Sequence, residues 1–237
     1  MDRIKDQVIF VTGATGGIGG AIARQLAAAG AEVAVSGRNA QALDALRQEL
    51  GDAAMAVAAD ATDESQVADA MGKARRHFGR LDTLINVPGM SVPAKLAEMD
   101  AGDFDRIFAV NVRTMFLCSK HFIQHLDADK GGLIVNISSV AGKAANPNAP
   151  AYCAAKAAVN MLSDGLQMQY KQANVRVSVI SPGAVTTPGF WGDRPVPHDK
   201  FLTPDQVAQV VTFVVGLPES VLVQDVVFQP WHFFKGK

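Results

Sequence analysis

The sequence predicts an α/β protein of the doubly wound type, in which helices cover both faces of a parallel sheet. Two observations lead to this fold class. Short apolar segments, rich in β-branched residues, alternate with helical segments along all 237 residues. The apolar segments are also continuous, whereas strands with one face in water alternate apolar and polar residues. Strands buried on both faces are typical of a parallel sheet.

The expected elements follow one another along the chain. Strand-like segments lie at 7–12, 31–36, 53–60, 81–87, 132–139, 175–182 and 226–228. Helical segments lie at 17–30, at 40–50, around Val67, Met71 and Ala74, near 103–126 and at 151–173. The segment 184–204 fits neither pattern, and loops of this length are usually functional or disordered. Because it follows the end of a strand, we expect it to be a substrate loop beside the ligand crevice.

The composition indicates one globular domain, residues 1–237, in the cytoplasm. The chain is 49% apolar and 19% charged, with a net charge of -1. This charge gives no electrostatic reason to expect nucleic acid or a membrane surface as a partner. The two cysteines, Cys118 and Cys153, are too few for a disulfide framework and suit a reducing compartment. The N-terminal residues have no apolar signal core, and no apolar run approaches the ~20 residues of a membrane span.

The first expected strand is followed by "TGATGGIG", in which Thr12 precedes Gly13, Gly17 and Gly19. Glycines at these positions permit positive φ angles and let the backbone approach a pyrophosphate. The helix that follows offers its free N–H groups and its dipole to phosphates. A tight strand-to-helix connection is the simpler alternative, but the position after the first strand favours dinucleotide binding. No Gly-Lys-Ser/Thr follows, which excludes a P-loop.

A second group of polar residues follows the fifth expected strand. Ser138 and Ser139 lie at its end, and Tyr152 and Lys156 lie four residues apart, on one face of the next helix. The phenol of tyrosine has a pKa of ~10, too high for proton exchange near neutral pH. A neighbouring lysine charge lowers that pKa toward the range that a general acid or base needs. A surface ion pair is the alternative for Tyr152 and Lys156 alone, and the combination with Ser139 and the glycine-rich turn favours catalysis.

Taken together, these motifs are similar to those of the short-chain dehydrogenase/reductase family over nearly the whole chain. The matching segments are "TGATGGIG", "VNV" with Asn111, "ISS" with Ser139, "YCAAK" with Tyr152 and Lys156, and "SPGAVTT". The resemblance implies a Rossmann-type sheet of seven parallel strands and a nicotinamide cofactor. It also implies that the protein is an oxidoreductase.

The resemblance implies a role for each catalytic candidate. Tyr152 would exchange the proton of the substrate hydroxyl, and Ser139 would hydrogen-bond the substrate oxygen. Lys156 would hold the nicotinamide ribose and lower the pKa of the phenol, while Asn111 would anchor a water chain that returns the proton. The cofactor-binding residues predicted on these grounds are Thr12, Gly13, Thr15, Gly17, Ile18, Gly19, Arg38, Asn39, Asp60, Ala61, Asn86, Gly89, Tyr152, Lys156, Pro182, Gly183, Val185 and Thr187.

One segment departs from the family pattern. The family has Asn-Asn-Ala-Gly after the fourth strand, whereas this chain has Asn86, Val87, Pro88 and Gly89. Val87 lacks the second side-chain amide, and Pro88 lacks a backbone N–H and fixes φ. The change either alters how the cofactor is seated or has no effect. We favour the second interpretation, since turns tolerate proline.

The stretch "VAVSGRNAQ" indicates which cofactor is used. A strand in this position usually ends in an acid that binds a ribose, but the one nearby acid, Glu32, lies at the strand's start. Arg38 is suited to pair with a 2′-phosphate, and Ser36 and Gly37 leave room for it. Asn39 is a candidate for one more donor. A solvated arginine is the alternative for Arg38, but a cation at a helix start is mildly unfavourable. We therefore predict NADP(H).

The substrate loop offers two aromatic residues, Phe190 and Trp191, and three polar ones, Arg194, His198 and Lys200. The aromatic residues suggest an apolar or planar contact. Arg194 either binds a substrate carboxylate or is solvated. The segment near 217–231 more closely resembles relatives that act on 3-hydroxy acids. We therefore expect a small carbonyl or alcohol substrate: a ketone, an aldehyde or a 3-hydroxy acid.

The remaining polar and aromatic residues give weaker signals. His121 and His125 have a spacing compatible with a metal, but no carboxylate or cysteine completes a ligand set, so we predict none. We expect Cys118 to lie in the core and Cys153 to have no chemical role. The aromatic tail with Trp231, Phe233 and Phe234 indicates a subunit contact or a cover over the core, and we predict a homo-oligomer, either a tetramer or a dimer.

Two functions fit these observations. The first is an NADP(H)-dependent reductase that uses Tyr152 as general acid/base. The second is a non-catalytic regulator that binds a dinucleotide on the same fold. Such a regulator needs no proton donor, so the combination of Asn111, Ser139, Tyr152 and Lys156 favours the enzyme.

Overall fold

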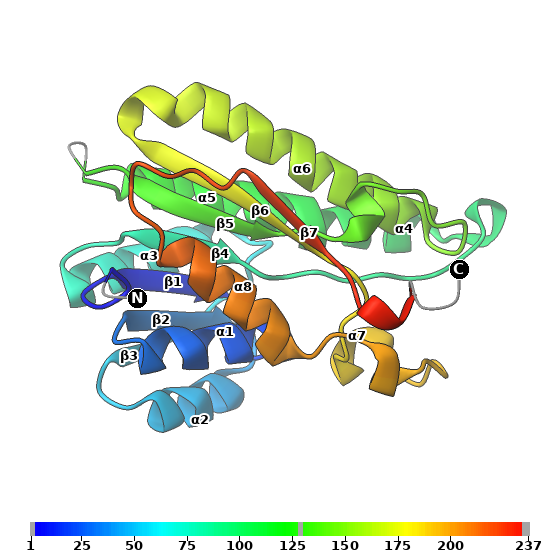
Figure 1. The fold of residues 1–237 in the computed structure, drawn as a ribbon, viewed down its shortest axis with the longest axis horizontal. Coiled ribbons are helices and arrows are strands. Elements are labelled where there is room, and N and C mark those ends of the chain that lie inside the picture. Colours follow the sequence, from blue (N-terminus) through cyan, green and yellow to red (C-terminus); the bar gives the residue numbers. More distant parts are fainter. Residues whose placement is uncertain (1–2, 128–129, 234–237) are drawn as a thin grey trace.

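The computed structural model describes residues 3–127 and 130–233. Seven parallel strands form one sheet in the order β3-β2-β1-β4-β5-β6-β7 (Figure 1). The strands are β1 Val8–Thr12, β2 Glu32–Gly37, β3 Ala54–Ala58, β4 Thr83–Asn86, β5 Gly132–Ile137, β6 Val175–Pro182 and β7 Asp225–Phe228. The predicted doubly wound, seven-stranded Rossmann-type sheet is therefore confirmed.

Helices pack against both faces of this sheet (Figure 1). The helices are α1 Gly17–Ala28, α2 Ala40–Leu50, α3 Glu64–Phe78, α4 Ala101–Phe108, α5 Thr114–Gln124, α6 Pro150–Tyr170, α7 Pro188–Trp191 and α8 Pro204–Val215. One core lies under α1, α2 and α8 and contains Ile22, Leu43 and Val211. A second core lies under α3, α5 and α6 and contains Met71 and Phe122. Burial on both faces explains why the strands are continuously apolar.

Helix ends carry the residues that local chemistry favours. Asp63 accepts a hydrogen bond from the backbone N–H of Gln66 at the start of α3, and Gly79 ends that helix in the left-handed conformation. Thr203 and Gln206 form a reciprocal capping box at the start of α8. These caps fix where each helix meets the sheet. In the part of the chain that the structure describes, no helix is both long and apolar enough to span a membrane.

The strand order reverses direction at β1, which pairs with β2 on one side and β4 on the other. Helix α1, which follows β1, and helix α5, which follows β4, cover opposite faces of the sheet. In doubly wound sheets, the crevice at the carboxyl ends of the strands, next to such a reversal, binds the ligand. The glycine-rich turn after β1 and the residues after β4, β5 and β6 all lie at this end.

Two segments differ from what the sequence predicts. The expected continuous helix near 103–126 is interrupted by a π-helical turn, Ala109–Arg113, between α4 and α5. The segment 184–204, which shows no element in the sequence, contains α7 and a short 3₁₀ turn, His198–Lys200. A parallel bridge between Val185 and Leu202 closes this loop at its base. The loop is therefore folded on itself.

Candidate active site

The glycine-rich turn after β1 has no room for side chains. Gly13 has φ +66°, which is in the left-handed region. A Cβ on Gly19 would lie 2.3 Å from the carbonyl oxygen of Gly13. Gly16 precedes α1, and no side chain caps that helix. The backbone N–H groups of its first turn are thus available for an anion, which fits a dinucleotide phosphate.

Two other segments pack onto this turn. A Cβ added to Gly13 would lie 3.2 Å from the Pro88 ring. A Cβ added to Gly17 would lie 3.2 Å from the methyl group of Thr187. The N–H of Val87 donates to Thr12 Oγ1 at 3.2 Å. Val87 and Pro88 therefore form part of the wall of the turn.

The segment after β6 reaches the same turn through an apolar contact. Val185 is buried and packs in one cluster with Leu202 and Val207, against which Ile18 of α1 also packs. Gly183 lies against Pro230, whose ring carbon is 2.9 Å from where a Cβ would be. The structure thus brings residues of the segment 182–187 next to the start of α1, as the sequence predicts for a cofactor site.

Helix α6 carries Tyr152 and Lys156 into the crevice, and Pro150 at its first position suits a helix start. Lys156 is 2% exposed. Its Nζ donates to the carbonyl oxygen of Ile137 at 2.9 Å and lies 5.9 Å from the centre of the Tyr152 ring. The two side chains therefore face the end of β5, on one side of the helix.

The pKa values differ from what the sequence predicts. Lys156 is expected to lower the pKa of Tyr152, but burial raises that pKa to about 12, and hydrogen bonding to Ser139 opposes the rise. Burial also lowers the pKa of Lys156 to about 8. The amine of Lys156 donates to a backbone carbonyl and lies away from the phenol, so in this arrangement Ser139 is the group that lowers the pKa of Tyr152.

The two serines after β5 have different surroundings. Ser138 is buried, and its hydroxyl donates to Asn160 Oδ1 at 2.6 Å. Ser139 is half-buried, and its Oγ accepts from the N–H of Ala141 at 3.1 Å. Ser139 faces Tyr152, whereas Ser138 joins the end of β5 to α6.

Asn111 lies in the π-helical turn, a feature that often marks functional sites. Its Nδ2 donates to the carbonyl oxygens of Met90 and Ile107 at 2.9 and 2.8 Å. Gly89 lies between Asn111 and Lys156, since a Cβ there would be 3.2 Å from Asn111 Oδ1 and 3.3 Å from Lys156 Nζ. The glycine is what lets these two side chains approach each other.

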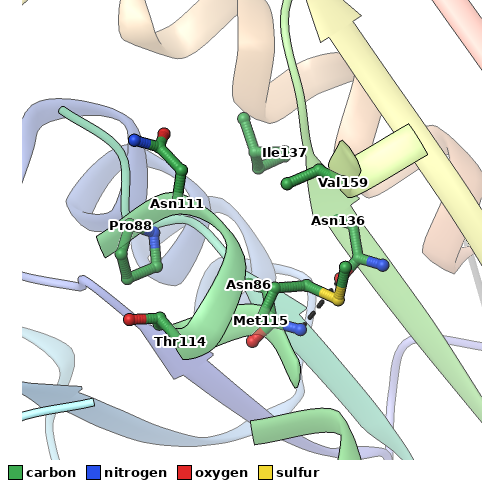
Figure 2. Close-up of a pocket in the computed structure, with 8 residues that line it drawn as sticks. All are labelled: Asn86, Pro88, Asn111, Thr114, Met115, Asn136, Ile137 and Val159. Atoms are coloured by element: carbon green, nitrogen blue, oxygen red, sulfur yellow. Dashed lines mark hydrogen bonds between the residues drawn. The ribbon is translucent and has the colours of Figure 1, made fainter. Parts of the chain in front are cut away.

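A small cavity of about 10 Å³ lies beside Asn111, at the size that one water molecule requires (Figure 2). Asn86 Nδ2 donates to Asn136 Oδ1 at 2.8 Å, and Asn136 Nδ2 donates to Ser163 Oγ at 2.9 Å. Within the described residues, the side-chain oxygens of Asn86 and Asn111 are buried without a hydrogen-bond partner. The cavity is lined by Asn86, Pro88, Asn111, Thr114, Met115, Asn136, Ile137 and Val159.

Comparison with known proteins identifies the family of this chain. The model of the short chain dehydrogenase family matches residues 7–195. This chain belongs to the short-chain dehydrogenase family. A cis-4-hydroxycyclohexanecarboxylate dehydrogenase of Sinomonas cyclohexanicum is 35% identical over 235 residues, which cover 94% of each chain. An uncharacterized oxidoreductase of Staphylococcus epidermidis is 32% identical over 234 residues, which cover 97% of this chain and 100% of the relative.

Solved structures of the short-chain dehydrogenase family agree with this fold. An alcohol dehydrogenase from Thermococcus sibiricus, complexed with 5-hydroxy-NADP, has a TM-score of 0.88 and 28% identity over 95% of this chain and 97% of its own. A 3-ketoacyl-(acyl-carrier-protein) reductase from Brucella melitensis, complexed with NADH, has a TM-score of 0.87 and 29% identity over 96% and 98%. The protein is therefore an oxidoreductase of a family that uses nicotinamide cofactors and small substrates.

At the end of β2, Arg38 is exposed, and its side chain makes no hydrogen bond or ion pair with any described residue. A Cβ on Gly37 would lie 3.2 Å from Thr15 Oγ1, so the first turn of α1 reaches this strand end. A groove of about 330 Å³ lies between α1 and α2. Arg24 lines this groove, and its guanidinium donates to the carboxylate of Glu49 through hydrogen bonds of 2.6 and 2.8 Å. Arg38 is thus a free cation near this edge of the crevice.

The other residues predicted near the adenine end have local partners. Asn39 Oδ1 accepts from the N–H of Ala42 and caps α2, and this cap leaves the Nδ2 amide group to donate to a ligand. Asp60 Oδ1 accepts from the N–H and hydroxyl of Thr62 at 2.9 and 2.8 Å. Ala61 packs at the edge of the core under α3 and α5. These contacts shape the turns after β2 and β3, at the same sheet end as Arg38.

His121 and Cys118 contribute no group to this site. His121 Nε2 lies 3.4 Å from Glu64 Oε1, and no group of three metal-ligating side chains occurs among the described residues. Cys118 is buried, and burial raises its pKa to about 12, as expected of a core residue. Cys153 accepts from the N–H of Asn146 at 3.2 Å. In the tail, Trp231 is exposed, Phe233 packs on Phe201, and Phe234 lies outside the described residues.

Sequence reasoning missed several residues that shape the site. Asn136 and Ser163 support Asn86, but each lies in an apolar or helical pattern that gives no functional signal. Phe201 was part of a loop without expected structure, yet its ring packs on Trp191 with centroids 5.0 Å apart. Nothing in the sequence indicates these contacts, because each joins residues from different elements.

Proposed function

We propose that this protein is an NADP(H)-dependent oxidoreductase that interconverts a small carbonyl compound and its alcohol, with Tyr152 as general acid/base. The observation that carries the proposal is the convergence of Tyr152, Lys156 and Ser139 at the carboxyl end of β5. Asn111 completes the group from the neighbouring π-helical turn. A non-catalytic dinucleotide-binding protein has no need of these four side chains together.

In the reduction, the residues of this chain supply a proton, positioning and charge. The bound nicotinamide supplies the hydride. The hydroxyl of Tyr152 donates its proton to the carbonyl oxygen, and Ser139 donates a hydrogen bond to the same oxygen. The hydrogen bond from Ser139 favours the phenolate that remains, and Lys156 would hold the nicotinamide ribose. Asn111, with its buried unpaired oxygen, accepts from a water molecule that returns the proton to this group.

NADP(H) is supported by Arg38. The end of β2 carries no carboxylate, and the side chain of Arg38 is exposed without an ion pair to any described residue. A guanidinium suits a 2′-phosphate through two parallel hydrogen bonds. The N–H groups at the start of α1 suit the pyrophosphate, and the segment 182–187 suits the nicotinamide. Of the two similar structures, the archaeal alcohol dehydrogenase is complexed with 5-hydroxy-NADP and the ketoacyl reductase with NADH, so the choice of NADP(H) rests on Arg38.

The substrate is a small ketone, aldehyde or 3-hydroxy acid. The relative that acts as a cis-4-hydroxycyclohexanecarboxylate dehydrogenase supports a secondary alcohol as the reduced form. We further propose a cytoplasmic homo-oligomer, a tetramer or a dimer. Both cysteines are free, and Phe213 of α8 and Val227 of the edge strand β7 expose apolar side chains. Light scattering tests this, and a monomer at micromolar concentration would contradict it.

A panel of carbonyl compounds with NADPH and NADH in parallel tests the enzymatic function. We expect turnover with NADPH, and the Tyr152→Phe variant should lower kcat by about 100-fold or more because the proton donor is lost. The same variant should keep the dissociation constant for NADPH, measured by protein fluorescence. Tight NADPH binding without turnover across the panel would instead support a regulatory protein.

A further inference from the structure

A chain of aromatic rings runs from Tyr152 into the loop 184–204. The ring of Phe190 lies edge-on to that of Tyr152, with centroids 5.7 Å apart. Trp191 packs on Phe190 at 5.3 Å and on Phe201 at 5.0 Å. Phe233, from the turn after β7, packs on Phe201 at 6.1 Å. The short helix α7, which carries Phe190 and Trp191, lies at the carboxyl end of the strands (Figure 1).

This aromatic group is fixed to the protein at several points. The indole N–H of Trp191 donates to the carbonyl oxygen of Val185 at 2.6 Å. The Val185–Leu202 bridge ties the same point to the other side of the loop. Edge-to-face contacts at these separations are favourable in addition to the apolar area that they bury. Phe190 is therefore held next to Tyr152 at several points, and the residue as a whole is only half-buried.

Arg194 adds to this support. Its guanidinium stacks over Trp191 at 4.9 Å and over Phe190 at 5.7 Å. Its Nε donates to the carbonyl oxygen of Trp191 at 2.7 Å, and its Nη2 donates to that of Phe190. These contacts direct two of its donors to the backbone of α7. Arg194 is thus anchored to α7 by two of its five donors, and the test below decides whether it also receives a substrate carboxylate.

We propose that Phe190 determines substrate specificity by selecting carbonyl compounds that bear an apolar ring, and that Arg194 is the positioning residue for Phe190. This rests on the proposed function, in which the hydroxyl of Tyr152 reaches the carbonyl oxygen. The groups attached to that carbonyl carbon then lie within a few ångströms of the Tyr152 ring and meet the neighbouring ring of Phe190. A flat apolar surface at that point binds a ring better than a short chain, because more apolar area leaves water.

The test compares two substrates through a specificity ratio, which is kcat/KM for cyclohexanone divided by kcat/KM for 2-butanone. This ratio does not depend on the concentration of active enzyme, so a partly unfolded variant still gives a valid result. We expect Phe190→Ala to lower the ratio by about tenfold or more, in line with the loss of several apolar contacts, and Phe190→Leu to lower it less. Phe116→Ala, at an exposed phenylalanine on α5, is the matched control and should keep the wild-type ratio.

A binding measurement without turnover gives a second readout. Cyclohexanol titrated into the protein with saturating NADPH forms a dead-end complex, and calorimetry gives its dissociation constant. Phe190→Ala should weaken this complex by about tenfold, while the dissociation constant for NADPH stays the same. A ratio within about threefold of wild type, together with unchanged cyclohexanol binding, would overturn the role of Phe190.

Arg194→Met tests the positioning role. We expect it to lower kcat/KM for cyclohexanone and for 4-oxocyclohexanecarboxylate by the same factor, because it loosens Phe190 for both. A loss confined to the carboxylate would overturn this and make Arg194 a carboxylate receptor. If wild type reduces no compound in the carbonyl panel, the proposed function fails. If it reduces ketones with a ratio that does not depend on Phe190, only the specificity proposal fails.

Discussion

The amine of Lys156 donates a 2.9 Å hydrogen bond to the carbonyl oxygen of Ile137, the last residue of β5. This bond joins α6 to the end of the central sheet and holds the amine 5.9 Å from the centre of the Tyr152 ring. It also keeps a cation in a site that is almost closed to water. A neutral carbonyl offsets only part of the cost of burying a charge, which is why the pKa of Lys156 falls to about 8.

We expect Lys156 to make the stability of the protein rise with pH above about 8. The amine has a pKa of 10.5 in the unfolded chain and about 8 in the folded protein. Between these values the unfolded state binds more protons, so the free energy of unfolding increases with pH, by up to about 3 kcal/mol. Below that range both states are protonated, and Lys156 contributes no slope.

Urea unfolding of wild type and Lys156→Met, from about pH 7 to about pH 10, measures this contribution. The difference between the two proteins should grow with pH above 8. The comparison is needed because burial raises the pKa of Cys118 from 9.0 to about 12, which lowers stability above pH 9 in both proteins. A difference that stays constant with pH would contradict the lowered pKa of Lys156.

Ser138 and Ser139 should separate stability from activity. Ser138→Ala removes the donor to Asn160 Oδ1 from a buried site, so we expect it to destabilise the protein by about 1–2 kcal/mol with kcat/KM unchanged. Ser139→Ala should lower kcat/KM by about 100-fold and change stability by less than about 1 kcal/mol, since Ser139 caps only one short turn. Urea unfolding and steady-state kinetics on both variants check this. The reverse pattern would assign the substrate hydrogen bond to Ser138.

Arg38→Asp should reverse the cofactor preference. The substitution removes the proposed partner of the 2′-phosphate and adds a repulsive charge, so the ratio of kcat/KM for NADPH over NADH should fall by about 100-fold or more. Arg47→Asp, an exposed arginine near the other end of α2, is the control and should leave the ratio unchanged. An unchanged ratio in Arg38→Asp would refute the role of Arg38.

Two glycine variants test the phosphate turn. Gly19→Ala puts a methyl group where the Gly13 carbonyl oxygen is 2.3 Å away, so we expect a loss of about 1–3 kcal/mol of stability and of NADPH binding. Gly165 lies on the exposed side of α6, where an added Cβ would meet no atom within 4 Å apart from the helix's own backbone, so Gly165→Ala should stabilise the protein by about 0.5–1 kcal/mol. Urea unfolding and NADPH fluorescence check both. Normal NADPH binding by Gly19→Ala would mean that the turn is not a phosphate site.

Much of the fold could be predicted because the signals for it are local. Continuous apolar strands and the helices between them fix the order of the elements. The positive φ of Gly13 fits the glycine that the sequence has there. Tyr152 and Lys156 share one face of α6 because residues four apart always do in a helix. The proposed site residues after β1, β5 and β6 meet at one end of the sheet because all of its strands are parallel.

Other features could not be read from the sequence. In the π-helical turn, the side chain of Asn111 is held by the carbonyl oxygen of Met90, which lies 21 residues earlier in the chain. The folded shape of the loop 184–204 depends on pairing Val185 with Leu202 and on the ring contacts of Phe190 and Phe201. In each case a partner comes from another part of the chain, so no pattern of neighbouring residues encodes the contact.

The fold class, the family resemblance and the residue types of the proposed site follow from the pattern of residues along the chain. The separate positions of Ser138 and Ser139, the backbone contacts of Arg194 and the raised pKa of Tyr152 follow from how the chain packs. The physical reason is that helix faces, caps and glycine turns depend on residues a few positions apart. Burial and hydrogen-bond partners depend on the whole packed chain, and they set the charge state of each group.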